Sequence, residues 1–288
     1  MKQYRIVLGI EVGKNFLRAA EVEHRDGTYF LSRLAEKKVE TGEVDELVKT
    51  LSLLLNDESI MSRIASVAID SSLMARDTIE IDPGMGSDEI SRFLRAEIDF
   101  HNNFSGETFI PAYEITKTPV EPYKEVFYAA MRKDVLFKLR NLCTRCGLDL
   151  QYMDLDHSCS ELAINKLTKD AGKYILITAK EGQVEASYCH GGERTMYRYI
   201  VHSGEPFYFI TKLTQYLELK AKEDADRLFV TGDAADDFLV DLLRKNADER
   251  YELLNLAPGL QLSNVASESP LLETHAHHFS HVIGAALK

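Results

Sequence analysis

The stretch YRIVLGIEVGKNFLRAAEVE, Tyr4–Glu23, alternates apolar and polar residues, breaks at Gly13-Lys14-Asn15, and then alternates again. Alternation with a period of two residues on both sides of a short polar turn predicts two strands joined as a hairpin. The unusual feature is the pair of glycines that flank Glu11 in the first strand, Gly9 and Gly13. Such a hairpin either holds an anion with its backbone or is only a hairpin.

The composition of the 288-residue chain is that of a water-soluble globular protein, with 45% apolar and 28% charged residues. The formal net charge of -12 argues against nucleic acid or an anionic membrane surface as the main partner. No apolar run approaches the roughly 20 residues that a membrane helix needs. Glu11 also interrupts the first apolar run before it reaches the length of a signal peptide. We therefore expect a cytoplasmic protein that binds no nucleic acid and does not itself insert into a membrane.

The same order of predicted elements occurs twice along the chain. Segments 4–70 and 174–232 each contain a strand, a polar turn, a second strand, a second turn and a third strand, followed by an amphipathic helix and a buried strand. A repeat of about half the chain indicates two duplicated domains rather than a solenoid. The alternative is a chance similarity of two hairpin-rich segments. Between the repeats, residues 71–125 form a separate stretch with a strand, the turn PGMG, a helix for which Ser87 is the expected cap, and a second strand.

Two similar α/β lobes that each open with a three-stranded meander resemble the actin-like ATPases. In that fold the first hairpin of each lobe turns backbone N–H groups toward the nucleotide phosphates, and an acid beside the first hairpin holds Mg²⁺ through water. The residues GIEVGKN resemble this phosphate hairpin, with Glu11 where the family usually has Asp. The resemblance implies a nucleotide site that includes the following residues of the first hairpin: Gly9, Glu11, Gly13, Lys14 and Asn15.

The middle of the chain resembles PilM, the actin-like family of type IV pilus assembly. The stretch VFYAAMRKDVLFKLRNLCTRCGLDLQYMDLDHSCSELAINKL matches that family in the order of its elements. Residues 71–125 resemble the extra subdomain that PilM shares with the cell-division protein FtsA, and HFSHVIGAALK resembles the last helix of the family. The implied fold class is a two-lobed α/β, actin-like (ribonuclease-H-like) fold. Its predicted parts are a first lobe at 1–70 plus 126–170, an inserted subdomain at 71–125 and a shortened second lobe at 171–288.

The second half of the chain departs from the family pattern at both nucleotide motifs. In YILITAKEGQ, Thr178 stands where Asp is expected, and Lys180 brings a side chain to a place where Gly lets the backbone approach a phosphate. The adenosine-side motif keeps Gly232 but continues with Asp233, which either repels a phosphate or caps the helix ADDFLVDLLRK. Only about twenty residues precede RLFVTG, which is room for one helix, so a nucleotide would lack the cover that the family usually provides.

These departures predict a scaffold with weak or lost binding of ATP and Mg²⁺ and without catalytic residues. By its resemblance to PilM, the chain would bind the cytoplasmic tail of a single-span inner-membrane assembly protein in a type IV pilus or type II secretion-like machine. That partner would recruit it to the inner membrane. The extra subdomain and the first lobe would form the groove, with DTIEID and TFIPAYEIT as candidate edge strands. The alternative is an active ATPase or small-molecule kinase of the same superfamily, and self-association is a third hypothesis.

Two further patterns are of types that can bind metals. Cys143 and Cys146 form a CxxC, but the chain has no second CxxC, so a pair of half-buried cysteines at a helix end is favoured over zinc. In the His-rich segment 275–281, His277 and His281 are four residues apart, a spacing that can hold zinc on one helix face. The simpler interpretation is a polar helix start, and we assign no metal site.

Overall fold

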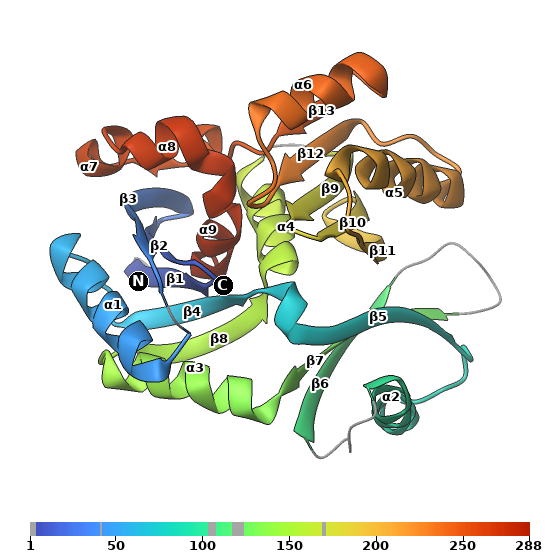
Figure 1. Cartoon of the computed structure of the whole chain (residues 1–288), viewed down its shortest axis with the longest axis horizontal. Coiled ribbons are helices and arrows are strands. Elements are labelled where there is room, and N and C mark those ends of the chain that lie inside the picture. Colours follow the sequence, from blue (N-terminus) through green and yellow to red (C-terminus); the bar gives the residue numbers. More distant parts are fainter. Residues whose placement is uncertain (1–3, 41, 103–107, 117–123, 169–170) are drawn as a thin grey trace. The chain divides into compact units, whose positions relative to one another are not determined.

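The computed structural model describes residues 4–40, 42–102, 108–116, 124–168 and 171–288 (Figure 1). Spatial contacts divide the chain into two compact units, and each unit gathers segments that are far apart in sequence. The first unit contains Met1–Ser71, Phe137–Asp170 and Leu254–Lys288, and the second contains Ser72–Leu136 and Ala171–Leu253.

The first unit is built on a six-stranded sheet in the order β14-β3-β2-β1-β4-β8. Its first three strands form an antiparallel meander, β4 pairs parallel with β1, and β8 pairs parallel with β4. The strands are β1 (Tyr4–Val12), β2 (Phe16–Arg25), β3 (Thr28–Lys38), β4 (Ile64–Ile69), β8 (Asp149–Leu155) and β14 (Gln261–Leu262). The hairpin predicted from the alternating sequence at Tyr4–Glu23 is therefore confirmed, and it lies in the middle of the sheet.

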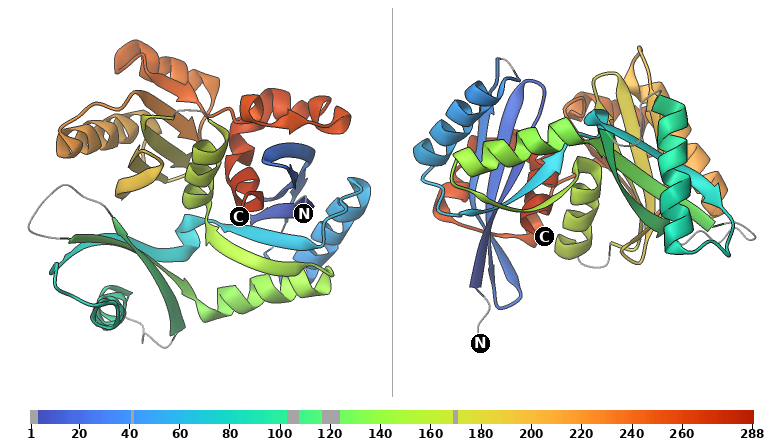
Figure 2. Two further views of the ribbon diagram at one scale, coloured as in Figure 1. Left: turned by 180° about the vertical axis from the view of Figure 1, so that it is seen from behind. Right: turned by 90° about the horizontal axis from the view of Figure 1, so that it is seen from below.

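Helices bury the two faces of this sheet. On α1, four leucines at helical spacing are buried, as the 3.6-residue period predicts: Leu47, Leu51, Leu54 and Leu55. The short helix α9 is buried along its whole length and packs against β1, β2 and α4, and Figure 2 shows α4 and α9 side by side. The helices of the unit are α1 (Val44–Asp57), α3 (Lys133–Arg145, within the unit from Phe137 onward), α4 (Asp156–Leu167), α7 (Asn264–Ser267), α8 (Pro270–His275) and α9 (Ser280–Ala286), with 3₁₀ turns η3 (Ala257–Gly259) and η4 (Ala276–Phe279). The 3₁₀ turn η1 (Ser71–Leu73) begins at the last residue of the first segment of this unit and continues into the second unit.

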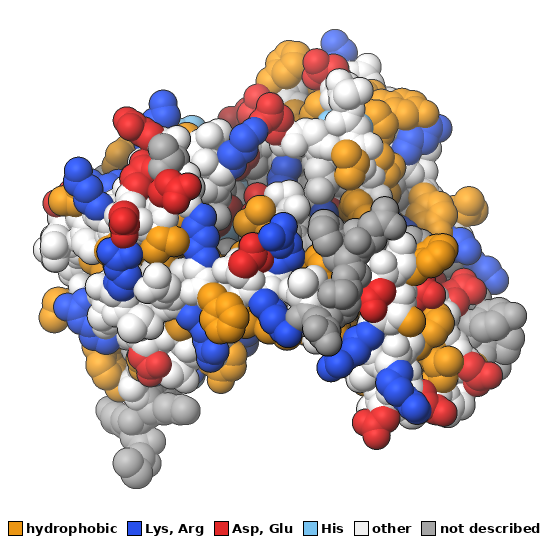
Figure 3. All heavy atoms as spheres, turned by 60° about the horizontal axis from the view of Figure 1, so that its bottom comes forward, with side chains coloured by type: hydrophobic (Ala, Val, Ile, Leu, Met, Phe, Trp, Pro, Cys, Tyr) orange, Lys and Arg blue, Asp and Glu red, His pale blue; other side chains and the backbone are white. Residues whose placement is uncertain are grey.

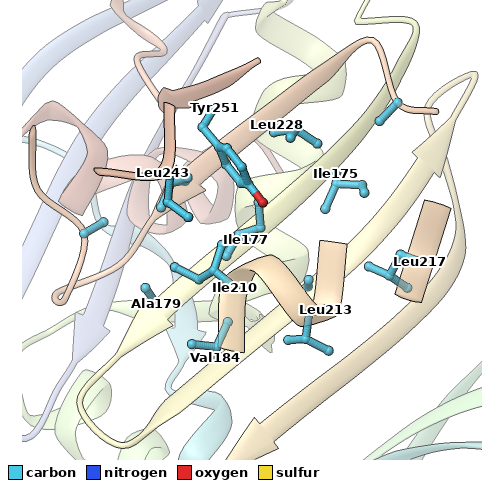
Figure 4. Close-up of a cluster of buried hydrophobic side chains, with 14 of the residues drawn as sticks. Ile175, Ile177, Ala179, Val184, Ile210, Leu213, Leu217, Leu228, Leu243 and Tyr251 are labelled. Carbon is cyan, nitrogen blue, oxygen red and sulfur yellow. The ribbon is translucent and has the colours of Figure 1, made fainter. Parts of the chain in front are cut away.

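The larger sheet of the second unit has five strands in the order β11-β10-β9-β12-β13. The strands are β9 (Lys173–Lys180), β10 (Gln183–His190), β11 (Glu193–Val201), β12 (Arg227–Thr231) and β13 (Tyr251–Leu253), accompanied by the helices α5 (Pro206–Ala221) and α6 (Asp237–Asn246). Apolar side chains of β9, β12 and α5 point toward one another around Tyr251, whose hydroxyl donates to Thr214 Oγ1 at 3.0 Å (Figure 4). As predicted from the length of the connection, one helix, α5, lies between β11 and β12.

The two large sheets repeat one topology, which confirms the predicted duplication. Without β14, the first sheet has the order β3-β2-β1-β4-β8, and the second has the order β11-β10-β9-β12-β13. If the strands of each sheet are numbered along the chain, both orders read third, second, first, fourth and fifth. In each, the first strand pairs parallel with the fourth and the fourth pairs parallel with the fifth. A chance similarity of hairpins does not account for the same order of five strands with the same directions.

A separate three-stranded sheet in the order β5-β7-β6 belongs to the second unit. It consists of β5 (Met74–Ile81), β7 (Lys124–Arg132) and β6 (Phe109–Thr116), and α2 (Ser87–Asn102) covers one face through the buried Ile90, Leu94 and Ile98. Ser87 is not the cap that the sequence predicted. The helix already begins there, and the N–H of Gly86 donates to Glu89 Oε2 at 2.9 Å.

The order of this small sheet confirms both predicted edge strands, because β7 lies between β5 and β6. DTIEID lies in β5 except for its last residue, Asp82, and TFIPAYEIT lies in β6 except for its first residue, Thr108. Proline in a sheet is confined to positions that donate no ladder hydrogen bond, so Pro111 is compatible with β6 only as an edge strand.

The compact units differ from the predicted division into lobes at three places. The predicted inserted subdomain falls in the second unit from Ser72 onward, residues 126–136 of the predicted first lobe fall there too, and Leu254–Lys288 falls in the first unit. The last difference has a clear cause, since α9 packs on β1 and α4. Spatial contacts alone do not test the assignment of sequence segments to lobes, which stays a prediction.

The surface carries charges of both signs. On the face drawn in Figure 3, Lys and Arg side chains are interspersed with Asp and Glu, and apolar side chains are scattered among them. Within the part of the chain that the structure describes, no helix is long and apolar enough to cross a membrane.

Candidate functional site

The first hairpin closes on itself through its own backbone. The N–H of Gly13 donates to the carbonyl of Phe16 at 2.9 Å, and the carbonyl of Asn15 accepts from the N–H of Val39 at 2.8 Å. Lys14 and Asn15 are exposed at the tip. The Gly13 N–H, a donor that the phosphate-hairpin resemblance assigns to an anion, is therefore used within the turn.

Glu11 is buried and contacts two side chains of the first unit, the guanidinium of Arg18 and the imidazole of His281. Arg18 stands directly opposite it on β2 and donates from Nη1 to Glu11 Oε2 at 3.3 Å. The ring of His281, on α9, places Nε2 at 2.7 Å from the same oxygen. Arg18 also donates from Nε to Glu36 Oε2 at 2.6 Å. The carboxylate that would attract hydrated Mg²⁺ is thus already engaged with protein donors, as buried charges generally are.

Gly9 has a packing role that the sequence did not reveal. A Cβ atom at this position would lie 1.8 Å from the carbonyl oxygen of Val282 on α9, so only glycine lets the helix lie so close to β1. Gly284 likewise allows close packing of α9 against α4, because a Cβ at this position would lie 1.8 Å from the carbonyl oxygen of Cys159. The predicted role of Gly9 in nucleotide binding stays a prediction, while its contact with α9 is sufficient reason for a glycine.

The acid missing from the second hairpin stands on its other strand. Thr178 occupies the expected Asp position on β9 and pairs directly with Glu185 on β10. Paired residues of an antiparallel ladder point to the same face, so Glu185 presents a carboxylate on the face where the family would have its Asp. Lys180, which stands where the family usually has Gly, directs its side chain toward this acid, with Nζ 3.3 Å from Glu185 Oε1.

Two further residues contact Glu185. Tyr197 on β11 donates its hydroxyl to Glu185 Oε2 at 2.5 Å, and Arg76 on β5 places Nε 3.6 Å from the same oxygen. Arg76 Nε donates to the Tyr197 hydroxyl at 2.8 Å. Burial, and then the charge of Glu185, raise the pKa of Tyr197 well above its usual range, so the phenol keeps the proton that it donates.

The Gly232 turn packs against the end of β9. Gly232 has a φ of +98°, and a Cβ there would lie 2.3 Å from the carbonyl oxygen of Ala179. The N–H of Ala234 donates to that same oxygen at 3.0 Å. Asp233 does not cap the following helix, because α6 begins at Asp237 and Asp236 accepts from the N–H of Leu239 at 2.7 Å.

The predicted site residues thus fall into two groups that the structure describes separately. The five residues of the first hairpin lie in the first unit, and Gly232 and Asp233 lie in the second. Sequence reasoning missed one of the hairpin acids, Glu185, and the contacts that four other side chains make with these acids: Arg18, His281, Arg76 and Tyr197. Arg18 and Glu185 could have been found by extending each hairpin ladder from its turn, whereas Arg76 and His281 come from distant segments.

Of the other two candidate patterns, the cysteine pair lies at a helix end as predicted, whereas the His-rich segment is no exposed polar helix start, because His277 and His281 are buried and His281 contacts Glu11. Cys143 and Cys146 are free thiols at the end of α3, and burial raises the pKa of Cys143 to about 12. Gly147 follows with a φ of +70° and ends the helix. The rings of His275 and His278 stack at 5.2 Å. Over the described ranges, no group of three or more His, Cys, Asp or Glu side chains is arranged to hold a metal ion.

Comparison with known proteins gives a match in structure but none in sequence. No family model and no curated protein matches the chain. A chain of the PilM–PilN type IV pilus biogenesis complex matches with a TM-score of 0.78 and 16% identity, over 98% of this chain and 97% of that one. The cytoplasmic domain of EpsL, an inner-membrane component of the type II secretion system of Vibrio cholerae, matches with a TM-score of 0.53 and 10% identity, over 98% and 95%.

A third solved structure names the fold. It is a protein of unknown function from Bacteroides thetaiotaomicron with an actin-like ATPase fold, which matches with a TM-score of 0.53 and 13% identity, over 89% of this chain and 92% of that one. Identities at this level are evidence of fold alone. The chain therefore has the actin-like α/β fold, in the form found in the PilM–PilN complex.

Proposed function

We propose that this protein is an actin-like assembly scaffold of a type IV pilus or type II secretion-like machine. In this role it binds the cytoplasmic tail of a single-span inner-membrane protein, is recruited to the membrane by that partner, and binds ATP weakly or not at all. The observation that carries the proposal is the match over nearly the whole of both chains to a chain of the PilM–PilN complex. The match extends over 98% of this chain and so includes both large sheets and the small one.

The engaged hairpin acids support the weak or lost nucleotide binding. In the first hairpin, the buried Glu11 contacts Arg18 and the ring of His281, and in the second, the buried Glu185 contacts Arg76 and Lys180. To bind hydrated Mg²⁺ a carboxylate would have to give up these partners, and separating a buried ion pair costs about 3–5 kcal/mol. Phosphoryl transfer also requires a positioned metal and water, for which we assign no residue.

The two edge strands of the small sheet, β5 and β6, differ in how well each could pair with an additional strand. Pro111 removes one N–H from β6 and, as proline does on exposed strands, discourages further pairing there. β5 contains no proline. The N–H of Thr78 donates to Asp77 Oδ1 at 2.7 Å rather than to β7, which places it on the outer edge. The register with β7 is unbroken, so the N–H groups of Arg76 and Glu80 point to the same side. We assign the tail to this edge of β5.

Binding of the tail is tested by calorimetry with a synthetic peptide. The neighbouring genes are first searched for a single-span membrane protein, and the peptide then comprises the cytoplasmic residues of that protein. Glu80→Pro removes an outward N–H without breaking the ladder to β7, and Glu80→Ala is the control that removes the charge alone. One edge hydrogen bond contributes about 0.5–1.5 kcal/mol, so the proline variant should bind about two- to tenfold more weakly than the alanine variant. Equal affinities would exclude β5, and no binding by the wild type would contradict the function.

Loss of nucleotide binding is tested by titration with Mg-ATP. The wild-type protein and Glu11→Gln, which keeps the shape of the side chain, should both show no saturable heat and no phosphate release above background. Saturable binding and hydrolysis by the wild type that Glu11→Gln abolishes would favour the alternative, an active ATPase or small-molecule kinase. Sedimentation of the same samples tests self-association.

A further inference from the structure

Four side chains of the second unit form one continuous polar cluster, which we call the Glu185 cluster: Arg76, Lys180, Glu185 and Tyr197. It begins on β5 of the small sheet and passes through the Tyr197 hydroxyl on β11 to Glu185 on β10. From there it reaches Lys180 at the end of β9. The cluster therefore joins the edge strand of one sheet to the β9–β10 hairpin of another.

Burial makes this cluster sensitive to the loss of any member. Glu185 is fully buried, Tyr197 is 1% exposed and Arg76 is 6% exposed. A buried carboxylate that loses a hydrogen-bond donor or an ion-pair partner raises the free energy of the folded state, so removal of one member of the cluster destabilises the contacts of the others. The guanidinium of Arg76 also lies over the ring of Tyr199, 4.4 Å from its centroid, which fixes its plane. The position of the Arg76 side chain is thus tied to that of Glu185.

The same residue also lies on the edge proposed for the tail. The backbone N–H of Arg76 points to the outer side of β5, while its side chain contacts Tyr197 and Glu185. A second bond reinforces this contact, because Thr78 Oγ1 donates to the Tyr197 carbonyl at 3.2 Å. A chain paired with β5 would therefore hold in place the residues that hold Glu185.

We propose that the Glu185 cluster couples the outer edge of β5 to the β9–β10 hairpin, so that a peptide bound along β5 stabilises the hairpin. Both the binding of a peptide along β5 and its identity rest on the proposed function. Coupling between two sites is reciprocal, so a ligand that ordered the hairpin would strengthen peptide binding by the same factor. A docking event at the small sheet would in this way be sensed at the strand pair that, in an actin-like fold, faces the nucleotide.

Hydrogen exchange of the protein without peptide tests the coupling directly. Tyr197→Phe keeps the ring and removes the hydroxyl, and Tyr199→Phe is the matched control because its ring remains beneath Arg76. We expect Tyr197→Phe to speed amide exchange at least about tenfold in both 74–81 and 178–185, with the control close to the wild type. Arg76→Lys, which keeps the charge but loses the planar fork, should act in the same direction. Faster exchange in only one of the two segments, or equally throughout the second unit, would overturn the proposal.

Adding the peptide separates this proposal from the proposed function. In the wild type, bound peptide should slow exchange at β5 and also in 178–185. In Tyr197→Phe it should slow exchange at β5 alone. Slowing of both segments in both proteins would overturn the coupling and leave the function intact. If the peptide does not bind, the function fails, and the measurement without peptide still decides whether the cluster couples the two segments.

Discussion

Replacing Gly9 by alanine separates a glycine that allows packing from one that allows a phosphate to approach. The added Cβ would lie 1.8 Å from the carbonyl oxygen of Val282, and real Cβ atoms essentially never come within 3.0 Å of such an atom. β1 and α9 would have to move apart by more than about 1 Å. Because α9 is buried along its whole length, such a shift loosens contacts with β2 and α4 as well.

The size of the effect follows from the packing. Overfilling a well-packed core typically costs about 1–3 kcal/mol, and a backbone that cannot yield raises the cost to the upper end of this range or beyond. We expect Gly9→Ala to lower the free energy of unfolding by about 3 kcal/mol. For a domain of this size that corresponds to a fall in Tm of roughly 6–12 °C.

The assay is urea unfolding followed by circular dichroism, supported by a thermal melt. Gly13→Ala is the control, because its Cβ would meet the Phe16 carbonyl oxygen at 3.2 Å, a contact that a small adjustment relieves. We expect Gly13→Ala to change stability by less than about 1 kcal/mol. A Gly9→Ala variant as stable as the wild type would refute the packing argument, and would do so most clearly if the same variant had lost binding of Mg-ATP.

Two further predictions concern ionisable groups. The hydrogen bond from Arg250 is the largest cause that holds the pKa of Asp248 below its usual value of 3.8, so the stability contributed by this carboxylate is present above about pH 4 and is lost as the pH falls further. Asp248→Asn should lower the free energy of unfolding by at most about 1 kcal/mol at pH 7 and should reduce its dependence on pH below about pH 4. An unchanged pH dependence in the variant would contradict this prediction. Burial raises the pKa of Cys143 to about 12, so this thiol should not react with iodoacetamide at pH 8 until urea unfolds the chain. Mass spectrometry measures the modification, and a reaction of Cys143 in the folded protein as fast as that of a small thiol would refute its burial.

The sequence was most informative where a local pattern matches a local structure. Alternation placed the central hairpin of the first sheet, and the leucines of α1 lie where the 3.6-residue period put them. The repeated order of strands followed from the same patterns. Choices among neighbouring polar residues were less secure, since Ser87 and Asp233 were candidate caps and the caps lie at Gly86 and Asp236. Several residues there have the right chemistry, and only the backbone geometry selects one.

The candidate site was harder to predict because its side chains meet across long stretches of chain. His281 reaches Glu11 over 270 residues, and Arg76 reaches Tyr197 over 121. No periodicity indicates such contacts. At Gly9 a local motif was present but suggested a different role. The motif resembles a phosphate hairpin, whereas in the structure the group that lies against Gly9 is the backbone of α9. A glycine signals that something comes close to the backbone but does not identify what that is.

The position of α9 also bears on how the protein is made. Strands β1 and β2 leave the ribosome early, yet the helix that rests on Gly9 is encoded some 270 residues later. Until α9 emerges, one face of the early sheet stays uncovered, and apolar strands in that condition are prone to associate with other chains. The first compact unit therefore has to wait for late synthesis to finish folding, and during this interval a chaperone would have most to protect.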